Sequence, residues 1–151
     1  MAVTQNSDPI FSGEFCHALD AKNRVTIPSR WRTSDADEFF LIVDRSGSFA
    51  RLMPPAQFRA VGERLAENPE IAPRDRAVFL RHFYSRSVQV ITDKQGRLTL
   101  PEEVGKKLGL DGEAVLVGAH QNFEIWNTKA WAATQQAEST VFDRVADLVG
   151  L

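Results

Sequence analysis

A nine-residue stretch occurs twice in this chain at a constant separation, and this repeat limits the possible folds more than any other feature. The first copy is DAKNRVTIP at residues 20–28, and the second is DKQGRLTLP at residues 93–101. The Asp, Arg, Thr and Pro positions all match at an offset of 73 (93 − 20 and 97 − 24, for example). Self-similarity at a fixed spacing indicates two related structural units within one chain.

Each copy has the pattern of a tight polar turn between two short strands. Apolar and polar residues alternate on both sides of the turn, as in Leu98, Thr99 and Leu100, and this period of two is typical of a β-hairpin. Asn23 and Gly96 occupy the same position, just before the Arg. Asn and Gly are residue types that adopt positive φ at low cost. We therefore predict a left-handed residue at this position in both turns.

An aspartate precedes each arginine by four residues, as Asp20 precedes Arg24 and Asp93 precedes Arg97. The Asp residues could pin the connection through an ion pair and through hydrogen bonds to nearby backbone amides. An exposed ion pair contributes only about 0–1 kcal/mol, so stability alone gives a weak reason for the arginines. We favour a binding role for them, because a turn rich in Lys and Arg presents charge suited to phosphate groups.

The repeat extends beyond the turns. Strands are expected at 39–43 and 49–53, with counterparts at 114–118 and 123–126, and the match of Phe49 to Phe123 gives an offset of 74. Helices are expected after Pro101, from Pro55 to Asn68, from Pro73 to about residue 83, and from Thr128 onward. The expected organisation is a flexible tail (1–10), a first half (11–60), a helical connection (61–86), a second half (87–131) and a C-terminal helix (132–151).

Composition and charge restrict the class of protein. The 151 residues are 43% hydrophobic and 25% charged, which is ordinary for a globular chain. A net charge of −2 counts against a simple nucleic-acid binder, whose domain is usually basic. However, the segment from Lys22 to Arg32 contains four basic residues and no acidic one, which allows a local basic surface. The longest apolar run, 39–43, is too short for a membrane span, and the single Cys16 suits a reducing cytoplasm.

No pattern for catalysis, a cofactor or a metal is found. Cys16 and His17 are adjacent, but the other histidines are distant and no spaced Cys/His set exists. Neither a phosphate-binding Gly-rich loop nor a nucleophile elbow occurs. The sequence therefore favours a protein that is not an enzyme and that uses no cofactor or metal.

The two Asp-x-x-x-Arg motifs, together with the flanking segments 11–14, 79–83 and 123–126, resemble the MraZ family of bacterial regulators, whose halves are of the AbrB/SpoVT type. The resemblance covers nearly the whole chain. Asn23 stands where Gly is common in the family, and the argument from positive φ accommodates this difference.

The resemblance implies a mixed α+β, β-rich fold: a double-split, swapped-hairpin β-barrel of two tandem pseudo-symmetric AbrB-like halves with additional helices. It implies a homo-oligomeric ring of about eight to twelve subunits with closed symmetry. It also implies binding of double-stranded DNA at promoter direct repeats and regulation, usually repression, of the cell-division and cell-wall gene cluster. Such a protein would be cytoplasmic and associated with the nucleoid.

Transferred position by position, the resemblance assigns DNA contact to six residues and support of the turns to Asp20 and Asp93. The DNA-facing candidates are Lys22, Asn23, Arg24, Lys94, Gln95 and Arg97. Two alternatives remain open at this point. The chain could be an antitoxin-like module that binds another protein through its helices, or a small barrel enzyme.

Overall fold

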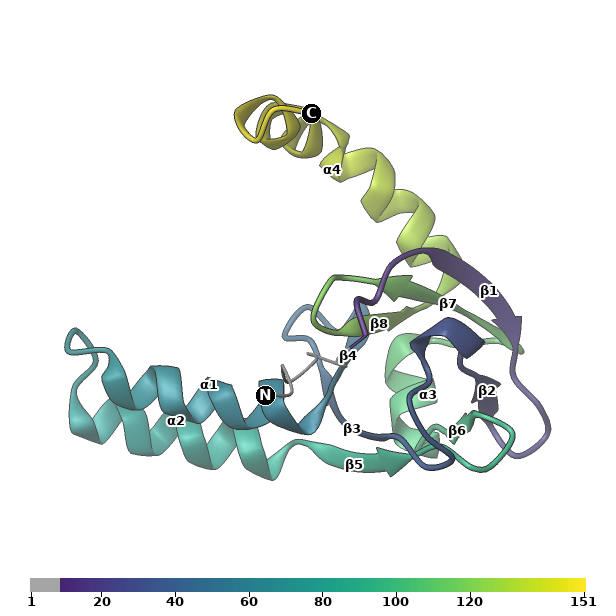
Figure 1. The fold of residues 1–151 in the computed structure, drawn as a ribbon, viewed down its shortest axis with the longest axis horizontal. Helices are drawn as coiled ribbons and strands as arrows, with labels where there is room; N and C mark the ends of the chain where they lie inside the picture. Colours follow the sequence, from purple (N-terminus) through teal and green to yellow (C-terminus); the bar gives the residue numbers. More distant parts are fainter. Residues whose placement is uncertain (1–8) are drawn as a thin grey trace, which may run out of the picture.

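The structure, a computed structural model, describes residues 9–151. The flexible tail expected at 1–10 therefore lies outside the described residues, apart from Pro9 and Ile10. The described part is a mixed α+β fold with a large antiparallel sheet and four α-helices (Figure 1). The eight strands are β1 (Glu14–Ala18), β2 (Arg24–Thr26), β3 (Glu38–Val43), β4 (Phe49–Met53), β5 (Val88–Ile91), β6 (Arg97–Thr99), β7 (Glu113–Gly118) and β8 (Phe123–Trp126).

Six strands form one sheet in the order β1-β7-β8-β4-β3-β5, and β2 pairs with β6 in a separate two-stranded sheet. All pairings are antiparallel. Within residues 9–151 the strands do not close into a barrel. The mixed α+β class predicted from the sequence is confirmed.

The strands of the two halves are interleaved. The pairing of β1 with β7 is mirrored by that of β5 with β3, while β2 and β4 pair with their own counterparts, β6 and β8. The hairpin expected around each turn is therefore wrong, because β1 and β2 pair with strands of the other half and not with each other. Pairing β2 with its duplicate explains this outcome, since it buries Val25 and Leu98 together completely.

The register of β4 against β8 also corrects the expected match of Phe49 to Phe123. The buried positions of the two strands correspond, Ala50 to Phe123 and Leu52 to Ile125. This match gives the offset of 73 found in the turns (123 − 50). Phe49 instead is partly exposed and stacks on Trp126 with ring centroids 4.5 Å apart. The two halves therefore correspond at their inward-facing positions, and Phe49 is not the counterpart of Phe123 because its side chain does not face inward.

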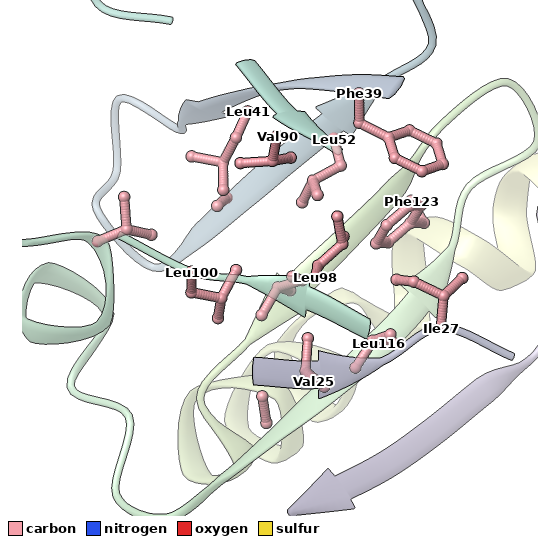
Figure 2. Close-up of a cluster of buried hydrophobic side chains, with 14 of the residues drawn as sticks. Val25, Ile27, Phe39, Leu41, Leu52, Val90, Leu98, Leu100, Leu116 and Phe123 are labelled. Atoms are coloured by element: carbon pink, nitrogen blue, oxygen red, sulfur yellow. The ribbon is translucent and has the colours of Figure 1, made fainter. Parts of the chain in front are cut away.

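The core lies between the small sheet and the large one. Figure 2 shows Val25 and Leu98 of the small sheet facing Leu41, Leu52 and other apolar side chains of the large sheet. Burial of one such side chain contributes roughly 1.5–3 kcal/mol. The small sheet therefore has one face fixed in the core, and its other face must point outward.

The helices occupy the predicted regions. They are a short 3-10 helix (Ser29–Trp31), α1 (Pro55–Glu67), α2 (Pro73–Ser85), α3 (Glu102–Leu108) and α4 (Thr128–Leu148). Gly109 ends α3 with φ 65°, as expected for a helix C-cap. The α1–α2 pair and α4 extend from the sheets in different directions (Figure 1). In the described part of the chain, no helix combines the length and apolar character that a bilayer span requires.

Candidate nucleic-acid interface

The two repeated turns have the same backbone geometry. The carbonyl oxygen of Asp20 accepts from Asn23 N at 3.0 Å, and Asp20 N donates to the Arg24 carbonyl oxygen at 3.1 Å. Asp93 makes the same two bonds, with Gly96 N at 2.9 Å and the Arg97 carbonyl oxygen at 3.0 Å. Asn23 has φ 58° and Gly96 has φ 77°. The predicted left-handed residue before each arginine is confirmed.

The aspartate side chains close these turns. Asp20 Oδ1 accepts from the backbone nitrogens of Lys22 and Arg24, both at 2.9 Å, and Asp20 Oδ2 accepts from Arg24 Nε at 2.7 Å. In the second turn the backbone nitrogens of Gln95 and Arg97 donate to Asp93 Oδ1 at 3.0 and 2.9 Å, and Arg97 Nε donates to Oδ2 at 2.8 Å. Both mechanisms considered for the Asp residues, the amide bonds and the ion pair, occur together.

These bonds also lower the pKa of both aspartates. The backbone N–H of Arg24 is the main cause that lowers the pKa of Asp20, and the Arg24 side chain adds to it. The backbone N–H of Arg97 lowers the pKa of Asp93 in the same way. Both carboxylates are therefore ionised at neutral pH, and each holds its arginine by Nε.

Arg24 and Arg97 leave the small sheet on the same face. Arg24 lies opposite Thr99, and Thr26 lies opposite Arg97. Side chains alternate along a strand, so these four point away from the core face that carries Val25 and Leu98. The two arginines are diagonal neighbours across the strand pair, a relationship that places Cα atoms about 7–8 Å apart.

The arginines are accessible for binding. Their side chains are 25% and 31% exposed, respectively, and the bond to each Asp uses Nε, so the Asp does not occupy the terminal nitrogens. One of these, Arg97 Nη2, donates to Gln95 Oε1 at 3.1 Å. The other candidates at the turns, Lys22, Asn23, Lys94 and Gln95, are exposed. The structure thus brings all six candidates to the two ends of one short ribbon.

One residue beside the second turn, Arg32, was counted in the basic segment 22–32 but was not among the candidate site residues. Arg32 Nη2 donates to the Lys94 carbonyl oxygen at 3.0 Å. Its side chain also lies against Gly96, where a Cβ atom would come within 2.7 Å of Arg32 Cδ. The signal in the sequence was Gly at position 96, which is needed here for space as well as for φ.

Among residues 9–151, no side chain supports the first turn in the way that Arg32 supports the second. The offset of 73 relates Arg32 to Gly105 (32 + 73), which has no side chain. Gly105, Asn23 and Leu100 instead line a hollow of about 320 Å³ behind the first turn. The two turns therefore share a backbone shape but differ in what holds them from behind.

No metal-binding cluster accompanies these turns. Among residues 9–151, no group of three or more His, Cys, Asp or Glu side chains is placed to hold a metal ion. The chemistry available at the turns is that of exposed guanidinium, ammonium and amide groups. Such groups bind phosphates and base edges.

The sequence of the chain also matches a known protein family. Residues 10–81 and 83–149 match the family described as "MraZ protein, putative antitoxin-like". The chain belongs to the MraZ family.

Curated relatives agree with this assignment. A protein of Limosilactobacillus fermentum is 34% identical over 138 residues, which cover 91% of this chain and 94% of the relative. One of Pediococcus pentosaceus is 35% identical over 138 residues (91% and 95%), and one of Desulfitobacterium hafniense is 34% identical over 143 residues (94% and 99%). Each of these relatives is named "Transcriptional regulator MraZ".

Proposed function

We propose that this MraZ family member is a sequence-specific, DNA-binding transcriptional regulator that contacts DNA through its two Asp-x-x-x-Arg turns. The observation that carries the proposal is that Arg24 and Arg97 leave one outward face of the β2–β6 ribbon while Val25 and Leu98 hold the other face in the core. The names of the relatives support a role in transcription.

The turns fix the arginines in a form suited to base contacts. Because each Asp holds Nε, less side-chain freedom is lost when the terminal nitrogens bind a partner. Arginine can donate two hydrogen bonds to O6 and N7 of guanine in the major groove. Lys22 and Lys94 are exposed beside them and would contact phosphates as point charges.

The wider proposal follows the family resemblance. A ring of about eight to twelve subunits would place several ribbons on the direct repeats of a promoter and raise the affinity roughly 10²–10⁴-fold where geometry allows. This gain in affinity would offset the weak DNA binding expected of a single subunit with a net charge of −2. The regulated genes would be the cell-division and cell-wall cluster, usually repressed, in a cytoplasmic, nucleoid-associated protein. The exchange of strands between the halves supports a swapped-hairpin arrangement.

The test replaces both arginines with alanine and measures binding to the promoter repeats upstream of the gene itself. One bidentate base contact gives about 1–3 kcal/mol of discrimination, so the double variant should lose most of its preference for the repeats. If about six phosphates are neutralised, the logarithm of the wild-type affinity should fall with log salt at a slope near −5.

Arg59→Ala is the matched control, because Arg59 is exposed on α1 and outside both turns. Light scattering should first show that all variants assemble like the wild type. An assembled double variant with wild-type affinity and specificity would refute the proposal. A stoichiometric protein partner that survives nuclease treatment would favour the antitoxin-like alternative instead.

A further inference from the structure

The hollow behind the first turn has room for a small molecule. It measures about 320 Å³, which is at the small end of the roughly 300–1,000 Å³ typical of ligand pockets. Asp20 and Asn23 of the turn line it, together with Gly105 of α3. A molecule bound in this hollow would therefore touch the turn that presents Arg24.

At the second turn, the corresponding position holds the Arg32 side chain. Arg32 Nη2 donates to the Lys94 carbonyl oxygen at 3.0 Å, and Arg32 Cζ lies 2.8 Å from the point where a Cβ of Gly96 would be. At the first turn, the offset of 73 places Gly105 where the second has Arg32 (32 + 73). A Cβ added to Gly105 would meet no atom within 4 Å. The first turn therefore lacks the arginine of the second and keeps open space in its place.

The first turn also offers the acceptor that such an arginine would use. Lys94 corresponds to Ala21 (94 − 73), and the two turns share their backbone geometry. Among residues 9–151, no backbone N–H group donates to the Ala21 carbonyl oxygen. A guanidinium group that lies in the hollow as Arg32 lies behind the second turn would find this oxygen free.

The lining of the hollow suits a cation on an aliphatic stem. Its apolar residues are Leu19, Leu100, Pro101 and Leu110, and its charged residues are Asp20, Glu102 and Lys106. Glu102 and Lys106 form an ion pair at 3.4 Å, and both side chains are 74% exposed. A pair this exposed adds little stability, so Glu102 can exchange Lys106 for another cation. Apolar walls with two carboxylates match a methylene chain with a positive end.

We propose that the hollow binds a small molecule that carries a guanidinium group on an unbranched aliphatic stem. The ligand holds the first turn from behind, as Arg32 holds the second, and so fixes Arg24 for contact with DNA. Binding of the ligand stands on the geometry of the hollow. Its effect on DNA rests on the function proposed above, and it makes DNA binding respond to the concentration of a guanidino compound.

Agmatine is the probe, because it carries a guanidinium group on a four-carbon stem that ends in an amine. The matched control is 1,4-diaminobutane, which has the same stem and the same charge but no guanidinium group. Calorimetry with the full chain should give a dissociation constant on the order of 1 mM for agmatine, since so small a ligand makes few contacts. Binding of 1,4-diaminobutane should be about tenfold weaker, because an ammonium group lacks the planar fork of donors.

Hydrogen exchange locates the bound probe. Agmatine should slow amide exchange in segment 20–26 and leave segment 93–99 unchanged, because Arg32 already supports the second turn. The control diamine at the same concentration should slow neither segment.

Two substitutions of Gly105 test the site itself. Gly105→Arg places a guanidinium side chain in the hollow, and Gly105→Ala is the matched control, because both replace a glycine inside α3 with a better helix former. The Arg variant should not bind agmatine and should show slow exchange in segment 20–26 without it. The Ala variant should still bind agmatine. Thermal unfolding checks that both variants fold.

Glu102→Gln is an independent variant at the rim of the hollow. Glu102 is 74% exposed, so the fold should persist. Loss of its charge should weaken agmatine binding about fivefold.

The effect on DNA is measured at about 10 mM of each compound, roughly ten times the expected dissociation constant. The two dications weaken phosphate contacts equally, so their comparison removes the effect of salt. Wild-type chain should bind the promoter repeats about fivefold more tightly in agmatine than in 1,4-diaminobutane. Gly105→Arg should bind the repeats equally well in both compounds.

The proposed site is overturned if agmatine gives no heat and no protection of segment 20–26. Equal protection by 1,4-diaminobutane or by inorganic phosphate would overturn guanidinium recognition, and agmatine binding to Gly105→Arg would place the ligand elsewhere. Agmatine that binds without changing DNA affinity would overturn the regulatory effect. The proposed function fails separately, if the double variant of Arg24 and Arg97 keeps wild-type DNA binding, and calorimetry of agmatine does not depend on that result.

Discussion

The backbone nitrogen of Ile27 donates a hydrogen bond to the carbonyl oxygen of Gly96 at 2.8 Å, so the first half holds the second turn. The reverse bond, from Leu100 N to the Asn23 carbonyl oxygen at 2.9 Å, lets the second half hold the first turn. Both bonds continue the β2–β6 pair. Both turns therefore depend on the short β2–β6 ribbon. A substitution of a buried side chain in this ribbon should alter the structure of both turns.

Leu98→Ala tests this dependence. Leu98 is fully buried, and replacing a buried Leu with Ala usually lowers the free energy of unfolding by about 2–5 kcal/mol. Denaturant titration should show this loss, and the amide NMR signals of Asn23 and Gly96 should both shift. Thr99→Ala on the exposed face should change stability by no more than about 0.5 kcal/mol. Shifts confined to the second turn would contradict the coupling.

Gly96→Ala should destabilise its turn, whereas Asn23→Gly should leave the other turn almost unchanged. Alanine at 96 would adopt φ 77°, which costs roughly 1–2 kcal/mol, and would collide with the Arg32 side chain. Glycine at 23 accepts φ 58° freely and should be close to neutral. Of the two variants, only Gly96→Ala should show a lower unfolding temperature and weaker DNA binding. Equal tolerance of the two changes would argue against the close packing of Arg32 on Gly96.

Arg32→Ala should weaken DNA binding by more than the loss of one positive charge alone would explain. The substitution deletes the bond to the Lys94 carbonyl oxygen and leaves the second turn without support from behind. Arg30→Ala is the matched control, because it removes the same charge while Arg30 lies over the Phe15 ring, 5.0 Å from its centroid. Affinities measured at several salt concentrations separate the shared charge effect from the extra loss. Hydrogen exchange at Gly96, but not at Asn23, should accelerate in Arg32→Ala.

The turns should lose their carboxylate bonds only below the pH range in which a free aspartate takes up its proton. The pKa values of Asp20 and Asp93 are lowered in the folded chain, chiefly by the backbone N–H groups of Arg24 and Arg97. A lowered folded pKa means that the stabilisation is fully present above the unfolded value of about 3.9 and is lost as the pH falls through the folded value. Carboxyl carbon NMR titration should place both transitions below that of a free aspartate. A transition at or above the ordinary value would show that the hydrogen bonds are absent in solution.

Much of the fold was accessible from the sequence because its signals are local. The positive φ at Asn23 and Gly96, the Gly109 cap and the starts of the helices at Pro55 and Pro73 each depend on neighbours within a few residues. The expected hairpins failed because alternation shows that a strand has a buried face but does not identify its partner. The match of Phe49 to Phe123 failed for a similar reason, since residue type alone does not show which side chain points inward.

By itself, the sequence determined two turns of one design, each with an aspartate, a left-handed residue and an arginine, because these features are set by backbone bonds that span four residues. Only the tertiary structure decided that both arginines share one outward face, that Arg32 supports just one turn and that α4 keeps an unburied stripe. The first two outcomes follow from strand pairing and packing between residues 62 or more positions apart, which the shared burial of Val25 and Leu98 brings together. Local preference shapes each turn, and the shared core places the two together.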